Sequence, residues 1–267
     1  MKSLVYGYIR RRDFRTVHTY CMFIGYQRSG HSLIGALIDA HPNAAMGMEV
    51  DTLYLVESGY SRNQIFYCLV RNSEVFTRSL GNIWTNYTYR VPGQHQGTYK
   101  ELQVIGDKKG GKSTLRLGED FSLLERLSAM VGCRIRVLHM IRHPMDNIST
   151  MIVRHTPPGS VPGHADILEK IDYYYKKAEI NDRLRKSGKI DYLDIWHEEF
   201  IDQPAQQITR ILEFIGLEPF PDYVSACASI IYKEPRKSRY DLDWPPDLEK
   251  FVYERARKYD FLNKYCV

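Results

Sequence analysis

The sequence has no long apolar run, no closely paired cysteines and no strong excess of charge, and each absence narrows the class of protein. None of its apolar stretches reaches the roughly 18 residues of a membrane-spanning helix. Its 5 cysteines show no CxxC spacing, so we expect no disulfide framework or zinc ribbon, and a reducing compartment fits best. The net charge of +5 is far from the clustered excess typical of nucleic-acid binding.

The first twenty residues carry the basic run Arg10–Arg12, which interrupts the apolar stretch that a signal peptide needs. We therefore predict a cytoplasmic protein with neither a membrane nor a nucleic acid as partner. A chain from which a leader had been removed would look the same. The 9 histidines are scattered without metal-ligand spacing, and we expect no metal site.

Short apolar runs alternate with amphipathic stretches, which is typical of α/β proteins. We find no linker, so the prediction is a single α/β domain over residues 1–267, with a core of about 20–260 and a central, mainly parallel sheet flanked by helices. The predicted strands are Cys21–Tyr26, Val104–Asp107, Ile135–Ile141 and Ile190–Ile195. The predicted helices are Gly30–Ala40, Asp120–Val131, Pro144–His155, Ala165–Ser187, Pro204–Ile215 and Pro246–Tyr259.

The first predicted strand runs through a glycine-bearing turn directly into a helix. This order brings free backbone N–H groups and the positive end of the helix together, as in anion sites. Gly25 and Gly30 have the spacing of a phosphate loop, with His31 in place of the Walker lysine and a cation at Arg28. The segment predicts an anion site; the alternative is a tight turn with a surface arginine.

This segment resembles the 5′-phosphosulfate loop of sulfotransferases that use 3′-phosphoadenosine 5′-phosphosulfate (PAPS). In that family a Lys or Arg precedes Ser-Gly-Thr-Thr and a helix, which often ends in Asp-x-His-Pro. Here Asp39–Pro42 matches that end, and His31 replaces the first threonine. The resemblance implies a P-loop-NTPase-like sulfotransferase fold, PAPS as sulfuryl donor and PAP as product. It assigns the cofactor to Arg28, Ser29, Gly30, His31 and Ser32, with Arg28 also catalytic.

Two further segments match the same family. Sulfotransferases bind the 3′-phosphate with Arg-x-Pro and a hydroxyl eight positions after the arginine, which implies roles for Arg142, Thr150 and the adjacent Ser149. An arginine leaving a strand can offer a bidentate fork to phosphate; the alternative is an exposed arginine beside buried hydroxyls. A basic loop near the C-terminus closes on the same phosphate in family members, which implies Arg236 and Lys237.

The general base is assigned by the resemblance to Glu49, which follows the Asp-x-His-Pro segment and Gly47. Asp51 is the reserve candidate, because it points to the same side if the segment is extended. His31 competes on chemical grounds, because an imidazole titrates near neutrality.

Residues Gly106–Ser113 match the literal pattern GxxxxGK[ST], which keeps an ATP-dependent kinase open as an alternative. Against it, we expect no helix immediately after the lysine, the better N-cap being Asp120, and no strand that ends in a Walker-B aspartate. Gly106-Asp107-Lys108 also resembles an acidic-lysine pair that several sulfotransferases carry near the sulfuryl group. That resemblance gives Lys108 a catalytic role in the transition state.

The sequence thus predicts transfer of the sulfuryl group from PAPS to a hydroxyl or amine of a small-molecule acceptor, by in-line displacement with a carboxylate as general base. A kinase and a non-catalytic nucleotide-binding module remain the alternatives. Neither the acceptor nor the oligomeric state can be read from the sequence.

Overall fold

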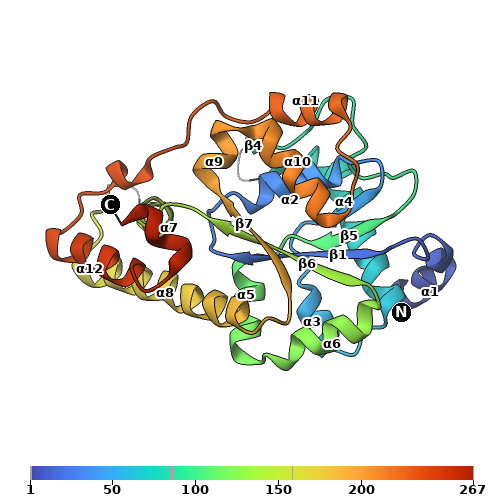
Figure 1. Ribbon diagram of the computed structural model, residues 1–267, viewed down its shortest axis with the longest axis horizontal. Helices are drawn as coiled ribbons and strands as arrows, with labels where there is room; N and C mark the ends of the chain where they lie inside the picture. The colour runs from blue at the N-terminus through green and yellow to red at the C-terminus, as the bar shows by residue number, and fades with distance from the viewer. Residues whose placement is uncertain (1, 85–86, 158, 267) are drawn as a thin grey trace.

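Five parallel strands form the central sheet of the computed structural model, which describes residues 2–84, 87–157 and 159–266. The strands lie in the order β2-β5-β1-β6-β7, as Figure 1 shows. Their bounds are Thr19–Gly25 (β1), Ala44–Gly47 (β2), Val104–Asp107 (β5), Arg134–Ile141 (β6) and Asp191–Trp196 (β7). The chain leaves β1 toward β2 but leaves β6 toward β7, so the order reverses between β1 and β6. Ligands of open α/β sheets bind outside the carboxyl ends of such a strand pair.

Helices cover both faces of the sheet, and a short hairpin of β3 (Ile83–Trp84) and β4 (Tyr87–Thr88) lies apart from it. The first six helices are α1 (Lys2–Ile9), α2 (His31–Asp39), α3 (Thr52–Glu57), α4 (Arg62–Leu80), α5 (Gly111–Glu119) and α6 (Ser122–Val131). The other six are α7 (Pro144–His155), α8 (His164–Lys186), α9 (His197–Asp202), α10 (Pro204–Ile215), α11 (Pro221–Ser229) and α12 (Pro246–Ala256). In Figure 1, α2, α10 and α11 lie on one side of the sheet and α3, α5 and α6 on the other.

Alternate residues of β1 pack into two separate hydrophobic cores, one on each face of the sheet. Met22 and Ile24 pack into the core formed with α3, α4, α5 and α6. Cys21 and Phe23 pack into the core formed with α2, α10 and α11. Because successive side chains of a strand point to opposite faces, a strand covered on both sides must be apolar throughout, and all of β1 is buried.

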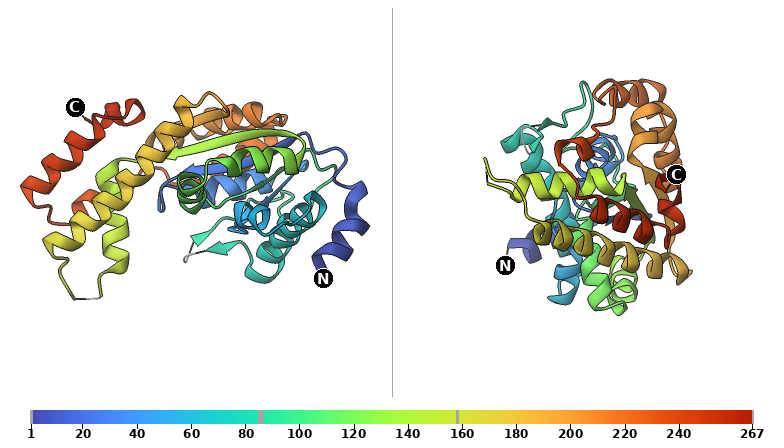
Figure 2. Two further views of the ribbon diagram at one scale, coloured as in Figure 1. Left: turned by 90° about the horizontal axis from the view of Figure 1, so that it is seen from below. Right: turned by 90° about the vertical axis from the view of Figure 1, so that its left-hand side faces the viewer.

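A third core joins α7, α8 and α12, which extend beyond the carboxyl end of the sheet in Figure 2. In the described part of the chain, no helix combines the length and the apolar character that a membrane crossing requires.

The predicted fold class is confirmed, and β5, α7 and α10 have the predicted bounds. The expectation that no helix follows Lys112 at once is wrong, because α5 already begins at Gly111. Gly118 lies inside α5, where a Cβ would come within 2.4 Å of Ile180 on α8. That glycine permits close helix packing and does not end a helix.

The longest element missing from the prediction is α4. Its buried residues Ile65, Phe66, Leu69, Val70 and Phe76 recur at helical spacing. Ser61 and Gln64 form a capping box, with the Ser61 N–H donating to Gln64 Oε1 at 3.1 Å. The pattern Ser-x-x-Gln is a known signal for a helix start, so the sequence did contain evidence for this helix.

Candidate active site

The loop between β1 and α2 has the backbone of an anion cradle. Gly25, Arg28 and Gly30 have positive φ angles of 125°, 68° and 102°, and α2 begins at His31. A side chain at Gly25 is excluded, since its Cβ would lie 2.6 Å from the Met140 carbonyl. This winding aims backbone N–H groups and the positive end of α2 at one point. We call residues 25–32 the anion loop.

His31 is a structural part of the anion loop. Its Nε2 lies 3.1 Å from the Ile24 carbonyl and its Nδ1 3.1 Å from Ser29 Oγ. A Cβ at Gly110 would lie 2.9 Å from the ring, so the imidazole fills the space between two loops. Burial lowers the pKa of His31 to about 3. A neutral, buried ring with both nitrogens engaged is poorly placed to accept a substrate proton or to contact a cofactor.

Arg28 provides the positive charge of the anion loop. It is half-buried, and its Nε is buried with no hydrogen-bond partner among the described residues. Burial, then the charge of Arg154 and that of Arg142, lower the pKa of Arg28. The charge of Glu49 opposes this shift more weakly, and a cluster of cations favours an anionic ligand. Arg154, which the sequence analysis missed, lies one helical turn after Thr150 on α7.

Arg142 joins the anion loop to the two other predicted segments. Its guanidinium donates to the Arg28 carbonyl at 3.1 Å, to Thr150 Oγ1 at 3.2 Å, to the Arg236 carbonyl at 2.7 Å and to Ser238 Oγ at 3.1 Å. Its Nε is buried and has no partner in the described part of the chain. The spacing of eight residues from Arg142 to Thr150 thus brings the two side chains into contact; their predicted binding of one phosphate stays a prediction.

Three residues assigned to the 3′-phosphate have side chains that are bound elsewhere or exposed. Ser149 is fully buried and accepts a hydrogen bond from the Trp244 indole at 3.1 Å. The Arg236 side chain is 78% exposed and pairs with Asp241 at 2.8 Å, and Lys237 is exposed. The basic loop reaches the site with the Arg236 backbone and Ser238, which the sequence analysis missed.

Glu49 and Lys108 meet because they follow adjacent strand ends. Gly47 of β2 pairs with Asp107 of β5, and the next residues of both strands turn toward each other. Lys108 Nζ lies 2.8 Å from Glu49 Oε1, and Lys109 Nζ lies 3.5 Å from Oε2. Lys108 is buried, whereas the Glu49 side chain is 40% exposed. The lysines outweigh the effect of partial burial and lower the pKa of Glu49.

The turn that carries Glu49 has a strained backbone, which hydrogen bonds to Asp107 hold in place. Glu49 and Asp51 both have φ near 67°, a region that costs energy for residues other than glycine. Asp107 accepts hydrogen bonds from the N–H groups of Val50 at 3.0 Å and Thr52 at 2.8 Å. A strained backbone conformation persists only where the surrounding structure holds it in place, and such positions are often found at functional sites.

Asp51, the reserve candidate for the base, is occupied in an ion-pair network. Arg116 binds both carboxylate oxygens, at 2.9 and 3.1 Å, and Lys112 lies 3.1 Å away. These partners overcome partial burial and lower the pKa of Asp51. The geometry gives Asp51 a structural role in tying α5 to the turn that carries Glu49.

Asp51→Asn should therefore lower the free energy of unfolding by about 1.5–3 kcal/mol, the range for hydrogen bonds to charged groups, and leave kcat within about threefold of wild type. Asparagine tolerates the left-handed backbone, so the variant removes charge without adding strain. Chemical denaturation and steady-state kinetics on the same preparation check it. If turnover instead fell at least 100-fold at unchanged stability, Asp51 would be the base.

The segment Gly106–Ser113 also has the order strand, loop, helix, but its details differ from an anion cradle. Only three residues, Lys108 to Gly110, separate β5 from α5, against five between β1 and α2. The Lys108 N–H donates to the Gly47 carbonyl at 2.8 Å, and Lys112 pairs with Asp51. The geometry favours the anion loop over this segment as the phosphate site.

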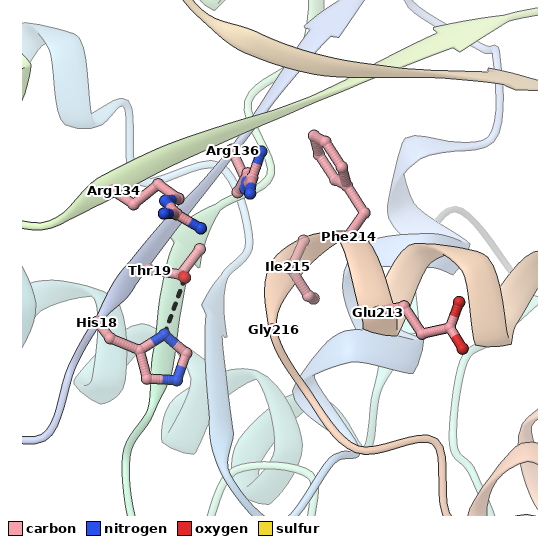
Figure 3. A pocket seen from close by; sticks show the side chains of 8 residues that line it. All are labelled: His18, Thr19, Arg134, Arg136, Glu213, Phe214, Ile215 and Gly216. Atoms are coloured by element: carbon pink, nitrogen blue, oxygen red, sulfur yellow. Dashed lines mark hydrogen bonds between the residues drawn. The ribbon is translucent and has the colours of Figure 1, made fainter.

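A separate pocket of about 500 Å³ opens at the amino ends of β1 and β6. Figure 3 shows its side chains, among them His18, Arg134, Arg136 and Phe214. Parallel sheets bind ligands at their carboxyl ends, so this pocket is not the candidate active site. Across the described ranges, no three His, Cys, Asp or Glu side chains gather to hold a metal ion.

Comparisons with known proteins agree with the sequence resemblance. Residues 123–222 match the model of the sulfotransferase family; this segment contains Arg142 and Thr150 but neither the anion loop nor Glu49. No curated protein gives a significant match.

Several solved structures share the fold. The sulfotransferase domain from the curacin biosynthetic pathway is 12% identical, with a TM-score of 0.54 over 91% of this chain and 99% of that one. The sulfotransferase from Alicyclobacillus acidocaldarius is 16% identical, with a TM-score of 0.50 over 92% and 94%. Sulfotransferase STF9 from Mycobacterium avium is 11% identical, with a TM-score of 0.53 over 97% and 81%.

The fold is that of sulfotransferases, as the resemblance implied. Residues 123–222 thus resemble the sulfotransferase family, and the chain shares the fold of solved sulfotransferases. The roles of individual residues are proposals, which the next subsection states.

Proposed function

We propose that the protein transfers the sulfuryl group of PAPS to a hydroxyl or amine of a small-molecule acceptor. The observation that carries the proposal is the contact between two phosphate motifs that lie 114 residues apart, with Arg142 donating to the Arg28 carbonyl and to Thr150. A phosphosulfate and a 3′-phosphate on one nucleotide require two adjacent anion sites of this kind.

The residues present fit such a cofactor. Both Arg28 and Arg142 carry a buried Nε without a partner in the described residues, and buried polar groups of proteins are normally satisfied. Arg28, the backbone N–H groups from Ser29 to Ser32 and the Ser32 hydroxyl would hold the phosphosulfate. Arg142, Thr150 and Ser238 would hold the 3′-phosphate.

PAPS, when bound, supplies an activated sulfuryl group on a phosphate leaving group. Glu49 accepts the proton of the acceptor hydroxyl or amine, which makes the acceptor oxygen or nitrogen nucleophilic. Lys108 and Lys109 keep the pKa of Glu49 low, so that the carboxylate is ionised at neutral pH. Lys108 stabilises negative charge on the transferred group, and Arg28 stabilises the charge that develops on the leaving phosphate oxygen.

Three further predictions accompany this function. We predict that residues 1–267 form one domain. We also predict a cytoplasmic location, on the basis of cysteine usage. The partner is a small-molecule acceptor, and nucleic acid is not expected. A non-catalytic nucleotide-binding module would share the anion sites but not the chemistry of Glu49.

A thermal-shift comparison of PAP with Mg-ATP tests the cofactor. PAP without magnesium, at 100 times its Kd, should add about 2.7 kcal/mol of stability, which raises Tm by roughly 5–10 °C for a chain of this size. AMP, which lacks the 3′-phosphate, is the matched control and should give a smaller shift. Stabilisation by Mg-ATP but not by PAP would support the kinase alternative.

A further inference from the structure

A fully buried lysine of α8 lies against the anion loop, and no family motif assigns it a role here. The Lys177 side chain is 0% exposed. Its Nζ lies 3.2 Å from Oε1 of Gln27, which belongs to the anion loop. Gln27 is held in turn by the Tyr173 hydroxyl, 2.9 Å from its Nε2. Nζ also lies 3.0 Å from the centre of the Tyr173 ring, where the protonated form would gain a cation–π contact.

The lysine runs next to the backbone of the loop. A Cβ at Gly111, the first residue of α5, would lie 3.4 Å from each of three atoms: Lys177 Cε, the Gln27 nitrogen and the Gly25 carbonyl oxygen. Lys177 therefore reaches the anion loop from the side of the sheet that α5 covers, in space that a glycine leaves open.

The charge of Lys177 has no acidic partner among the described residues. The polar and titratable groups that face it are Tyr173 and Lys176 on α8 and Gln27 on the anion loop, while α5 presents Gly111. The cations of α5, Lys112 and Arg116, are paired with Asp51. Burial, and next the charge of Lys176, lower the pKa of Lys177 to about 7. An ammonium buried among neutral groups is costly unless an anion compensates it.

We propose that Lys177 is a further anion-binding residue of this site, which takes up a proton from solvent when a polyanion enters the anion loop. The negative charge of the ligand favours the ammonium form, so the proton moves from water or buffer to Nζ on binding. Before binding, the neutral amine avoids an uncompensated buried charge. The proposal rests on the proposed function only for the identity of the anion.

Calorimetric titration with PAP in buffers of different ionisation enthalpy measures the proton uptake. At pH 8 the phosphates of PAP are ionised, and a lysine with a pKa of about 7 should take up about 0.9 proton per ligand, falling to about 0.1 at pH 6. Lys177→Met keeps the apolar stem and should abolish that uptake. Lys177→Arg carries a permanent charge; it should take up no proton and should keep its PAP affinity above pH 7.5, where wild type loses up to about tenfold per pH unit.

The melting temperature gives a second test. If Lys177 only stabilised the fold, replacing it would lower Tm, whereas the proposal predicts that Tm rises. The folded-state pKa of Lys177 is depressed, so the unfolded state binds more protons between about pH 7 and 10, and the lysine costs stability below about pH 10. Lys177→Met should therefore raise Tm at pH 7 by roughly 2–4 °C or more while weakening PAP binding. A lowered Tm with unchanged proton uptake and unchanged PAP affinity would overturn the proposal.

Inorganic pyrophosphate separates this inference from the proposed function. If wild type binds pyrophosphate with a proton uptake that Lys177→Met lacks, but does not bind PAP, Lys177 is an anion residue and the cofactor assignment fails. If PAP binds and wild type and Lys177→Met take up equal numbers of protons, the cofactor assignment stands and the inference about Lys177 fails. If neither ligand binds, both fail.

Discussion

Glu49→Gln should lower kcat by about 10²–10⁴, the usual contribution of general base catalysis, and leave PAP affinity within about threefold of wild type. Glutamine keeps the size of the side chain and can still accept a hydrogen bond from Lys108, which lies 2.8 Å from Oε1. It loses the charge that accepts the acceptor proton. Steady-state kinetics at saturating donor and calorimetry with PAP measure the two quantities.

The matched control for Glu49→Gln is Asp51→Asn, two residues away on the same strained turn. Both variants replace a carboxylate by its amide at φ near 67°. Asp51→Asn should change stability and Glu49→Gln should change kcat. The pH profile adds a check, since the pKa of Glu49 is lowered and kcat should stay level from pH 8 down to about pH 5. A fall in kcat around pH 6–7 would contradict Glu49 as the base.

Arg142→Ala should weaken PAP binding by about 30- to 1,000-fold, because truncating one partner of a buried charge pair typically costs several kcal/mol. More specifically, the preference of the protein for PAP over AMP should nearly vanish, since Arg142 is assigned to the 3′-phosphate. Competition binding of both ligands to each variant gives this ratio. The ratio is insensitive to the fraction of unfolded protein, which matters because Arg142 also ties three segments together.

Arg142→Lys and Thr150→Val refine the test. Lysine keeps the charge but not the planar fork, so it should restore only part of the preference. Thr150→Val keeps the shape and removes one hydroxyl, and a loss of about 5- to 10-fold in PAP affinity is expected. An Arg142→Ala protein that still prefers PAP over AMP as strongly as wild type would place the 3′-phosphate elsewhere.

Local signals in the sequence, together with the resemblance to sulfotransferases, were sufficient for the fold class and for the positions of the anion loop and of the segment from Arg142 to Thr150. Gly25 and Gly30 mark left-handed backbone between a strand and a helix, and Pro144 marks the start of α7. Both signals depend on a few neighbouring residues. The contact between Arg142 and Thr150 joins the residue after β6 to the second turn of α7, and it depends on a spacing that the sequence shows.

Long-range contacts could not be predicted in this way. Lys177 and Gln27 lie 150 residues apart, and a lysine in a polar helix gives no sign that it is buried. The loss of His31 as a base candidate depends on its bonds to the Ile24 carbonyl and to Ser29. The ion pairs of Asp51 depend on where α5 begins. The roles of Ser149, Arg236 and Lys237 remain predictions that their side-chain positions do not favour.

Transfer of ³⁵S from labelled PAPS to a panel of alcohols, phenols, amines and sugars tests the central claim most directly. We expect the protein to transfer label to at least one acceptor without magnesium. Glu49→Gln should bind the donor equally well but transfer label at least about 100-fold more slowly. Tight PAP binding with no transfer of label to any member of the panel would contradict it, and would instead support a nucleotide-binding module without catalysis.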